Sequence, residues 1–562
     1  MKMRNAVKLC AVVLTAMQVV MTSCRAQSKP LPAVTCDSLR ETPVVTTECG
    51  DVVGVYTEDM KVRVYAGIPY ASPPVGELRW KAPQAAEKWK GVLKATHFSP
   101  IAMQPRMPLP LANKIAEALG LPTKGAEEPM SEDCLYLNVW TPESAGGDGK
   151  SADKSMSSKE TGRELHPVLV YFHGGSLRTG AGSEAYCRGE SAARAGVVMV
   201  TVNYRLGVFG FLSLPELSAE SGLGSGNYGL LDQIFALQWV RRNIKAFGGD
   251  PARVTIAGES AGSQCVSALC VSPLAKGLFC SAIGESATFA CPWLASDTFT
   301  QEKSERLGLE YMKSLGKLTL EQMRALPAEV LVKKELSEVS LTVDGFVLPE
   351  SVYQLYQKGR QNDVPLLIGY NAKEGGLFTI GMSFKPQECV DKVKALFGDE
   401  SGEKILQLYP CGNESEARQS MNKLVGAFAI GWPTDCWARI QCSTGKSDVY
   451  KYYYTYKQNE GLGANHGTEM EYAYHNPNAQ SLWKESDYAF SEKMFSYWMN
   501  FVKWGTPNGK EGGCPKECGE TALPVWKSYK ESPHEIMEIG DGIGMMGEPN
   551  QSLYDILNTM KR

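Results

Sequence analysis

The 562-residue sequence lacks a surplus of basic residues, because 62 Asp and Glu outnumber its 58 Lys and Arg and the formal net charge is −4. Nucleic-acid binding usually requires a clustered positive excess, so this balance argues against a nucleic-acid partner. Hydrophobic residues make up 43% of the chain and charged residues 21%. This ordinary globular composition excludes disordered, collagen-like and disulfide-scaffold classes, and it allows one large α/β unit.

Patterns of metal ligands are also missing. The 16 Cys include no paired C-x-x-C spacing, and the sequence holds only six His. We therefore expect no zinc site, and no other metal or cofactor is implied. Two pairs of Cys lie close enough in sequence to suggest disulfides in an exported protein, namely Cys436 with Cys442 and Cys514 with Cys518.

Long apolar runs are absent apart from one near the N-terminus. Three basic residues in the first eight precede an apolar run from Leu9 to Met21, and Thr22–Gln27 follow. This run is too short for a comfortable membrane span. A short basic stretch, an apolar run and a small-residue exit are typical of a secretory signal peptide. We expect residues 1–26 to be the signal peptide, residues 27–43 a tether, and the protein to be exported to the periplasm or the extracellular space.

Two cleavage sites remain open for this signal. Cleavage after Ala26 would release the protein. Alternatively, Met21-Thr22-Ser23-Cys24 resembles a bacterial lipobox, which would leave a membrane-anchored lipoprotein with a lipid on Cys24. Met at the first position and Arg25 after the Cys are atypical for a lipobox.

The rest of the chain alternates short β-rich apolar runs with helical patterns. The runs are Val168–Phe172, Val197–Asn203, Val254–Ala257, Leu278–Ile283, Pro365–Gly369 and Val449–Tyr456. Leu230–Phe247 has apolar residues three and four apart, which predicts a helix. Near-continuous apolar strands between helices predict an α/β fold with a mostly parallel central sheet. Gly54–Pro83 predicts an antiparallel start to that sheet. We expect residues 44–562 to form one domain.

Two stretches have the character of insertions. Glu143–Glu164 is rich in Ser, Gly, Lys and Asp, which predicts a mobile surface loop. Pro105–Pro129 holds five Pro around a short helical pattern. It is either a surface helix or a flap over a pocket.

The run from Arg253 to Gln264 carries the chemistry. It reads as a buried strand followed by Gly258-Glu-Ser260-Ala-Gly262 and then a helix, the context of a nucleophile elbow. Gly at both ends removes the Cβ atoms that would collide in so tight a turn, and backbone strain there would present the Ser260 hydroxyl to a base.

A second G-E-S occurs at Gly284–Ser286, after another apolar run. Its fifth position is Thr288, whose branched side chain should crowd the turn. We therefore expect Ser286 to lie behind the reacting groups at most.

A serine nucleophile needs a general base, usually His, and a carboxylate that orients it. In the nucleophile-elbow fold the base follows the serine in the chain, which leaves His466, His475 and His534. His466 lies in a Gly-flanked loop after the run Val449–Tyr456, whereas the other two lie in a Tyr-rich helical pattern and a polar stretch. His466 is the best candidate.

The orienting acid should leave a strand end between the serine and the histidine. Glu374 follows the apolar run Pro365–Gly369 and a polar turn. Asp344 resembles a turn residue and Asp363 precedes the strand, so Glu374 is the better candidate.

Donors for the tetrahedral oxyanion complete the expected site. The backbone N–H of Ala261 follows the nucleophile, and His173-Gly174-Gly175-Ser176 follows an earlier strand with small residues that let the backbone turn toward a substrate. His173 precedes the nucleophile in the chain, so we expect it to support this loop rather than to catalyse.

Taken together, these motifs resemble those of the type B carboxylesterases. The matching runs are Tyr65–Ala71, Ser131–Val139, Tyr171–Ser176, Asn203–Gly207, Asn227–Gln233, Phe247–Pro251, Gly258–Gly262, Glu374-Gly375 and His466-Gly467. The resemblance implies an α/β-hydrolase fold with loop and helical insertions around a gorge. It also implies Ser260 as nucleophile, Glu374 as acid and His466 as base, with Gly175, Ser176 and Ala261 as oxyanion donors.

Three departures from the family pattern bear on specificity. Ser176 stands where many members have a third Gly, and its side chain should narrow the space for the acyl group of the substrate. Met103 stands in place of the usual disulfide partner of Cys134. The segment between Met103 and Cys134 has no Trp, which argues against choline esters.

The expected activity is hydrolysis of carboxylic esters through an acyl-enzyme. Two alternatives are a lipase for longer acyl chains, if Pro105–Pro129 is a lid, and a non-catalytic binding module on the same fold. Binding modules of this architecture typically lose the nucleophile or the base, and this sequence retains both. The expected partner is a small ester substrate, with Cys24 as a possible lipid attachment point.

Overall fold

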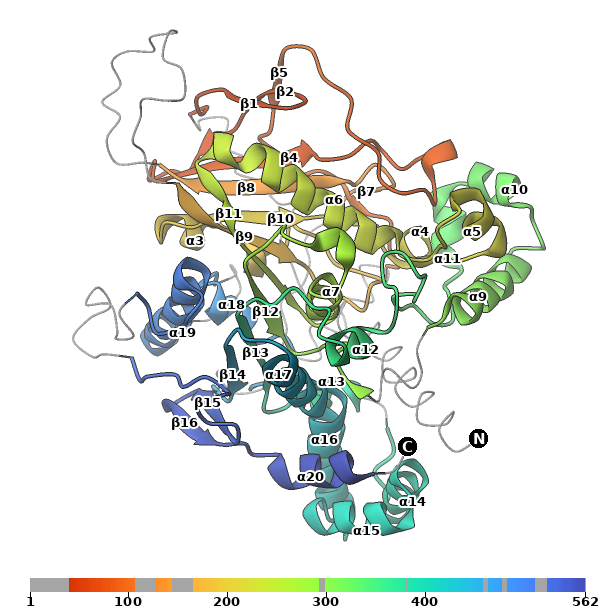
Figure 1. Ribbon diagram of the computed structural model, residues 1–562, viewed down its shortest axis with the longest axis vertical. Helices are drawn as coiled ribbons and strands as arrows, with labels where there is room; N and C mark the ends of the chain where they lie inside the picture. Colours follow the sequence, from red (N-terminus) through yellow and green to blue (C-terminus); the bar gives the residue numbers. More distant parts are fainter. Residues whose placement is uncertain are drawn as a thin grey trace.

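The computed structural model describes residues 40–106, 128–143, 165–292, 299–379, 382–457, 463–477, 483–510 and 523–560. At its centre lies an 11-stranded sheet in the order β16-β15-β14-β13-β12-β11-β9-β10-β8-β4-β3 (Figure 1). These strands are β3 (Val55–Tyr56), β4 (Val62–Pro69), β8 (Tyr136–Pro142), β9 (His166–Phe172), β10 (Val198–Val202), β11 (Gly249–Glu259), β12 (Ser281–Glu285), β13 (Leu366–Asn371), β14 (Val449–Tyr454), β15 (Glu535–Ile539) and β16 (Ile543–Gly547).

The seven consecutive strands from β15 to β10 run parallel. Their side chains alternate between two buried layers, as in β9, where Val168 and Val170 face one hydrophobic cluster and Leu169 and Tyr171 face the other. Burial on both faces is the reason these strands read as continuous apolar runs. The predicted mostly parallel sheet is confirmed, and so is the antiparallel start, because β3, β4 and β8 pair antiparallel.

Helices cover both faces of the sheet (Figure 1). One layer contains α6 (Tyr228–Asn243), α7 (Ala261–Leu269), α12 (Val352–Gln357) and α17 (Trp432–Thr444). The other contains α3 (Glu190–Arg194), α18 (Met470–Ala473) and α19 (Glu485–Trp504). The predicted helix at Leu230–Phe247 is α6 continued by the 3₁₀ turn η3 (Ile244–Phe247).

The remaining helices form two groups beyond the sheet. The first group contains α4 (Gly207–Phe211), α5 (Pro215–Ser221), α9 (Gln301–Ser314), α10 (Leu320–Ala325) and α11 (Ala328–Lys333). The second group contains α13 (Gly375–Phe378), α14 (Pro386–Phe397), α15 (Asp399–Leu408), α16 (Glu414–Gly426) and α20 (Gln551–Thr559). Short strands make two smaller sheets from β1 (Val45–Thr47), β2 (Gly50–Val53) and β5 (Val92–Lys94), and from β6 (Ile101–Ala102) and β7 (Met130–Ser131).

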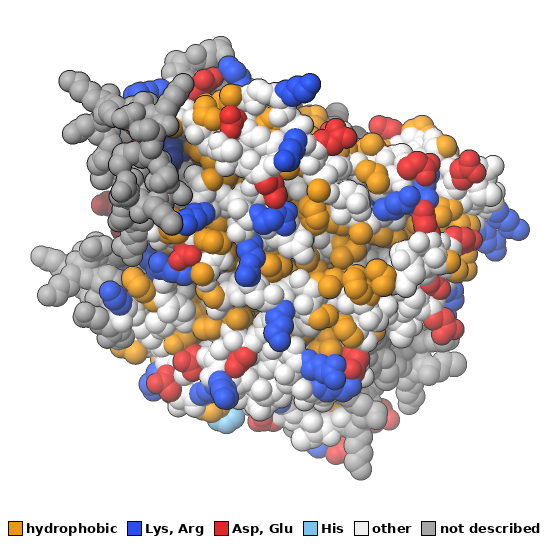
Figure 2. All heavy atoms as spheres, turned by 45° about the horizontal axis from the view of Figure 1, so that its top comes forward, with side chains coloured by type: hydrophobic (Ala, Val, Ile, Leu, Met, Phe, Trp, Pro, Cys, Tyr) orange, Lys and Arg blue, Asp and Glu red, His pale blue; other side chains and the backbone are white. Residues whose placement is uncertain are grey.

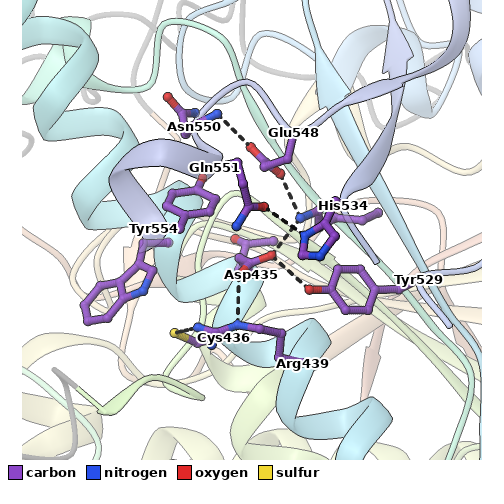
Figure 3. A network of polar contacts seen from close by, with 12 residues as sticks. Asp435, Cys436, Arg439, Tyr529, His534, Glu548, Asn550, Gln551 and Tyr554 are labelled. Atoms are coloured by element: carbon purple, nitrogen blue, oxygen red, sulfur yellow. Dashed lines mark hydrogen bonds and ion pairs between the residues drawn. The ribbon is translucent and has the colours of Figure 1, made fainter. Parts of the chain in front are cut away.

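A buried ionic network fastens the C-terminal segment to the sheet (Figure 3). Lys451 on β14 lies 2.8 Å from Asp435 on α17 and 2.7 Å from Glu548, which follows β16. Tyr370 on β13 donates to Glu548, and Tyr529 donates to Asp435. Burial opposes a charged Lys451, but the two carboxylates outweigh that effect and raise its pKa. Each buried charge therefore has opposite charge and hydrogen bonds around it, which burial of an ion requires.

Several smaller expectations can be compared with the structure. Asp344 is a turn residue as predicted, because its carboxylate accepts three N–H groups from residues 346–348. The suggested Cys436–Cys442 disulfide is wrong: both Cys lie on α17, six positions apart and so toward different sides of the helix, and both are free. Cys134 is also free. Cys514, Cys518 and nearly all of both suspected insertions lie outside the described residues.

Candidate active site

The strand-to-helix turn at Ser260 is a strained elbow. β11 ends at Glu259, α7 begins at Ala261, and Ser260 between them has φ 56° and ψ −123°. A side chain at positive φ costs on the order of 1–3 kcal/mol. A Cβ on Gly258 would lie 2.5 Å from the carbonyl carbon of Gly262, and one on Gly262 would lie 2.1 Å from the Phe172 oxygen. Only glycine fits at either position.

Neighbouring elements hold this strained residue in place. The Ser260 N–H donates to the Glu285 carbonyl at 2.8 Å, and the Ser260 carbonyl accepts from the Gln264 N–H at 3.0 Å. Glu259 on β11 pairs in register with Glu285 on β12. The serine therefore stands at the carboxyl end of two parallel strands, the edge at which α/β proteins bind ligands.

His466 and Glu374 are in direct contact. His466 Nδ1 lies 2.5 Å from Glu374 Oε2, and both side chains are fully buried. The other Glu374 oxygen accepts the Asn371 N–H at 2.7 Å. The Lys373 N–H donates to the Ala464 carbonyl at 2.8 Å and so joins the two loops that carry these residues. The contact fixes the tautomer of His466, because Nδ1 must carry the proton that Glu374 accepts.

The second ring nitrogen of His466 faces the base of the elbow. Nε2 lies 3.2 Å from Glu259 Oε1, one residue before the serine. Within the described residues, Ser260 Oγ is not hydrogen-bonded to this nitrogen. Catalytic hydrogen bonds of this kind are often long or misaligned without substrate.

Four buried carboxyl groups surround the imidazole. Glu259 and Glu374 contact it, while Glu285 and Glu469 form a layer behind it. Glu469 accepts from Ser286 Oγ at 3.2 Å and from the Asn371 side-chain amide. Glu285 accepts from Tyr474 at 2.9 Å and from Trp498 at 3.0 Å.

These four groups cannot all ionise together, because like charges in a buried site repel. Burial raises the pKa of Glu285 to about 8, although its two hydrogen bonds oppose the change. Burial and the charges of Glu259 and Glu374 raise the pKa of Glu469 well above its ordinary value. Glu285 is therefore mainly protonated at neutral pH, and burial and its acidic neighbours disfavour the charged form of Glu469 as well.

The same two carboxylates set the basicity of His466. Burial alone would lower its pKa, but Glu374 and Glu259 outweigh burial and raise it to about 9. The imidazolium that forms when a proton leaves a nucleophile is thus stabilised in advance.

A pH profile should reveal the contribution of Glu259. A general base must be neutral, so kcat/KM should fall as the pH decreases through about 9, the pKa to which His466 is raised. Glu259→Gln removes one negative neighbour, so the pKa of His466 should fall and the acid limb of the profile should move to lower pH. Glu216→Gln, on exposed α5, is the matched control. An unmoved limb in Glu259→Gln would show that this carboxylate does not act on the imidazole.

The loop after β9 lies beside the nucleophile. A Cβ on Gly174 would lie 2.6 Å from the Glu259 carbonyl oxygen and 3.1 Å from Ser260 Cβ. Gly175 and Ser176 continue the loop at φ 104° and 57°. In the part of the chain that the structure describes, the N–H groups of Gly175 and Ala261 have no backbone acceptor. Donors therefore remain available next to the serine hydroxyl.

His173 supports this loop, as its position in the sequence predicted. Its Nδ1 lies 2.9 Å from the Gly174 carbonyl, and its ring stacks on Tyr204 with centroids 4.4 Å apart. Tyr204 in turn donates to the His173 carbonyl at 2.7 Å. The His173 ring is thus held by a hydrogen bond at Nδ1 and by stacking on Tyr204.

The competing residues lie elsewhere. His475 contacts Ser491 at 2.8 Å, and the exposed His534 contacts Gln551 at 3.4 Å. Asp363 accepts the N–H groups of residues 446 and 447. Ser286 lies behind the imidazole, with its hydroxyl directed to Glu469.

Ser286 lies behind the imidazole as expected, but the reason given for this position is wrong. Thr288 was expected to prevent a tight turn, yet Ser286 has φ 56°, the same value as Ser260. What differs is the element that follows: α7 begins directly after Ser260, whereas residues 287–291 are not helical, and the Ser286 side chain is fully buried.

The sequence reasoning did not identify Glu259, Glu285 and Glu469. A signal existed, because two Glu sit at the ends of otherwise apolar strands and one follows His466 by three residues. In the described ranges, no group of three His, Cys, Asp or Glu is arranged to hold a metal ion. No described helix is both long enough and apolar enough to cross a bilayer.

Comparisons with known proteins agree with this arrangement. The model of the carboxylesterase family matches residues 41–556. Para-nitrobenzyl esterase of Bacillus subtilis (strain 168) is 34% identical over 90% of this chain and 96% of its own length. Fumonisin B1 esterase of Sphingopyxis macrogoltabida is 33% identical over 89% of this chain and 86% of its own. A solved structure of a PNB esterase superposes with a TM-score of 0.72 and 31% identity, covering 92% of this chain and 99% of that one.

Proposed function

Because the chain belongs to the carboxylesterase family and hydrolyses carboxylic esters, we propose that Ser260, His466 and Glu374 are its catalytic triad. The observation that carries the proposal is the 2.5 Å contact between His466 Nδ1 and Glu374 Oε2, next to a serine strained at φ 56°. Glu374 holds the imidazole in the tautomer whose Nε2 can accept a proton.

The reaction then proceeds in two halves. Ser260 Oγ attacks the ester carbonyl while His466 Nε2 takes its proton, and the imidazolium returns that proton to the alcohol as it leaves. Water, deprotonated by the same nitrogen, attacks the acyl-enzyme and releases the carboxylic acid. Glu259 and Glu374 stabilise the imidazolium in both halves, and the N–H groups of Gly175, Ser176 and Ala261 donate to the oxyanion.

A mechanism-based label tests the nucleophile directly. A fluorophosphonate ester should phosphonylate Ser260 with loss of fluoride and stop hydrolysis after one equivalent. Trypsin cleaves after Arg253 and Lys276, so Ser260 and Ser286 fall on different peptides. Mass spectrometry should find the adduct on the peptide 254–276. An adduct on the following peptide, which contains Ser286, would refute the assignment.

We also propose that the protein is exported, with residues 1–26 as its signal. Either cleavage after Ala26 frees it, or a lipid on Cys24 anchors it. Each buried CH₂ adds about 0.8 kcal/mol of membrane affinity, so two acyl chains would hold it on a membrane. Intact-mass analysis of the protein from its own host decides between the two. An unmodified N-terminus at Gln27 rules out the anchor, and a lipidated Cys24 rules out free release.

A further inference from the structure

A basic surface lies at the edge of the sheet opposite the candidate active site. The elbow stands at the carboxyl end of β11, whereas the cations gather where the same strand begins. They are Arg241 at the end of α6, Lys245 in η3, Arg253 on β11, Lys276 after η4 (Pro273–Ala275) and Lys510 after α19. Figure 2 shows Lys and Arg side chains spread across the middle of the face that it presents. We call these five residues the basic face.

The charge of the basic face is not neutralised locally. Within the described ranges, none of its five members has a carboxylate within ion-pair distance, whereas the adjacent Arg242 lies 2.7 Å from Glu48. Asp250, at the start of β11, is half-buried and accepts the Ala252 N–H at 2.9 Å. A chain of net charge −4 thus concentrates positive charge on one surface, which attracts polyanions.

An exposed aromatic side chain stands within this face. Trp504, the last residue of α19, is 44% exposed. The Arg253 guanidinium lies 5.9 Å and the Lys510 ammonium 5.5 Å from its ring centroid. A hollow on the basic face is lined by Arg241, Pro251, Ala252, Gly277 and Phe279. An indole ring among cations with long aliphatic stems suits the boundary between lipid headgroups and water.

The described chain begins beside β3, where the Arg40 carbonyl accepts the Tyr56 N–H, and it reaches the rim of the basic face just after β1. The Glu48 N–H, just after β1, donates to Asn243 at 2.9 Å, and the Glu48 carboxylate pairs with Arg242 at the end of α6. Sixteen residue steps separate Cys24 from Arg40, where the described chain begins. Such a segment can span at most about 55 Å, at roughly 3.3–3.6 Å per residue. A membrane-bound N-terminus would therefore keep the folded body within about 55 Å of the bilayer.

We propose that the basic face docks the enzyme on a bilayer rich in anionic phospholipid. Its cations contact the phosphates and Trp504 enters the headgroup layer, while the opposite edge of the sheet, with Ser260, points toward water. The orientation follows from the two ends of β11 and holds whether or not Cys24 carries a lipid. It predicts an enzyme for dissolved esters that works beside a membrane rather than on lipid substrates within it.

Vesicle sedimentation tests the docking surface. The chain from Gln27, without Cys24, should bind vesicles of phosphatidylcholine with 30% phosphatidylglycerol at low salt and should not bind pure phosphatidylcholine vesicles. Lys245→Glu, Lys276→Glu and Lys510→Glu together should weaken binding at least about 100-fold, since each cation near an anionic surface contributes about 1 kcal/mol, or roughly fivefold in affinity. Trp504→Ala should weaken binding further without changing its salt dependence.

A matched control separates this surface from general charge effects. Lys313→Glu, Lys333→Glu and Lys334→Glu, on exposed positions of α9 and α11 and the residue after it, change the net charge equally. This control should bind within about threefold of the parent, and every variant should hydrolyse a soluble p-nitrophenyl ester at the parent rate. Equal loss in both triple variants, or no binding to anionic vesicles, would overturn the proposal. Binding to polyphosphate without binding to vesicles would also overturn it.

Discussion

Ser260→Ala is expected to abolish ester hydrolysis, with a loss of about 10⁵- to 10⁶-fold in kcat, because members of a triad act as one unit. Ser286→Ala should retain a substantial fraction of the activity. Both serines have φ 56°, so backbone strain alone does not distinguish them. Their surroundings do: Ser260 directly precedes the first turn of α7 and lies beside Gly174 of the loop after β9, whereas Ser286 donates to Glu469 behind the imidazole.

Steady-state kinetics with a soluble p-nitrophenyl ester would measure both changes. Thermal unfolding should accompany them, because Ser286→Ala removes a buried hydrogen bond worth about 1 kcal/mol. Comparable losses in both variants, with both folded, would contradict the assignment of the elbow. Full activity in Ser260→Ala would exclude this serine as the nucleophile.

The fold could be predicted largely from local patterns. The runs in β9, β10, β13 and β14 are apolar because both faces of the sheet are covered, and that burial is visible in the sequence. Strand limits were less predictable. β11 begins at Gly249, five residues before the predicted Val254, because Gly249 pairs with His166 of β9. Pairing to another strand has no local sequence signature.

The candidate site was predictable where a chemical motif fixes the chain locally. Ser260, Glu374 and His466 each follow an apolar run and sit among glycines, and the structure brings Glu374 and His466 together. The sequence did not reveal Glu285 and Glu469 behind these residues, because their contacts join distant parts of the chain. Glu469 meets Asn371 and Ser286 across 98 and 183 residues. Such contacts depend on the assembled sheet.

The buried acids explain how one imidazole can be surrounded by four carboxyl groups. Only Glu259 and Glu374 contact it, and the raised pKa values of Glu285 and Glu469 favour the neutral form of both groups. The neutral pair can therefore pack behind the site without adding charge. Glu259 and Glu374 therefore stabilise the imidazolium, whereas Glu285 and Glu469 fill the polar space behind it.

His466→Ala should reduce activity nearly as far as Ser260→Ala, by about 10⁵-fold or more, because the remaining serine has no base within reach. Added imidazole should restore part of the loss by occupying the vacated space, a result that a merely structural histidine would not give. His475→Ala is the matched control. It loses the 2.8 Å contact with Ser491 and should lower stability by about 1 kcal/mol while leaving kcat within a few-fold.

The activities that remain in His466→Ala and His475→Ala decide which histidine is the base. His475 is the nearer rival in sequence, only nine positions after His466, yet its ring packs among Trp483, Tyr488 and Phe495, and its Nδ1 contacts Ser491. Burial lowers the pKa of His475, whereas the carboxylates raise that of His466 to about 9. The opposite order, with a severe loss in His475→Ala and near-normal kcat in His466→Ala, would mean that the base had been misassigned and that Glu374 orients a residue without a catalytic role.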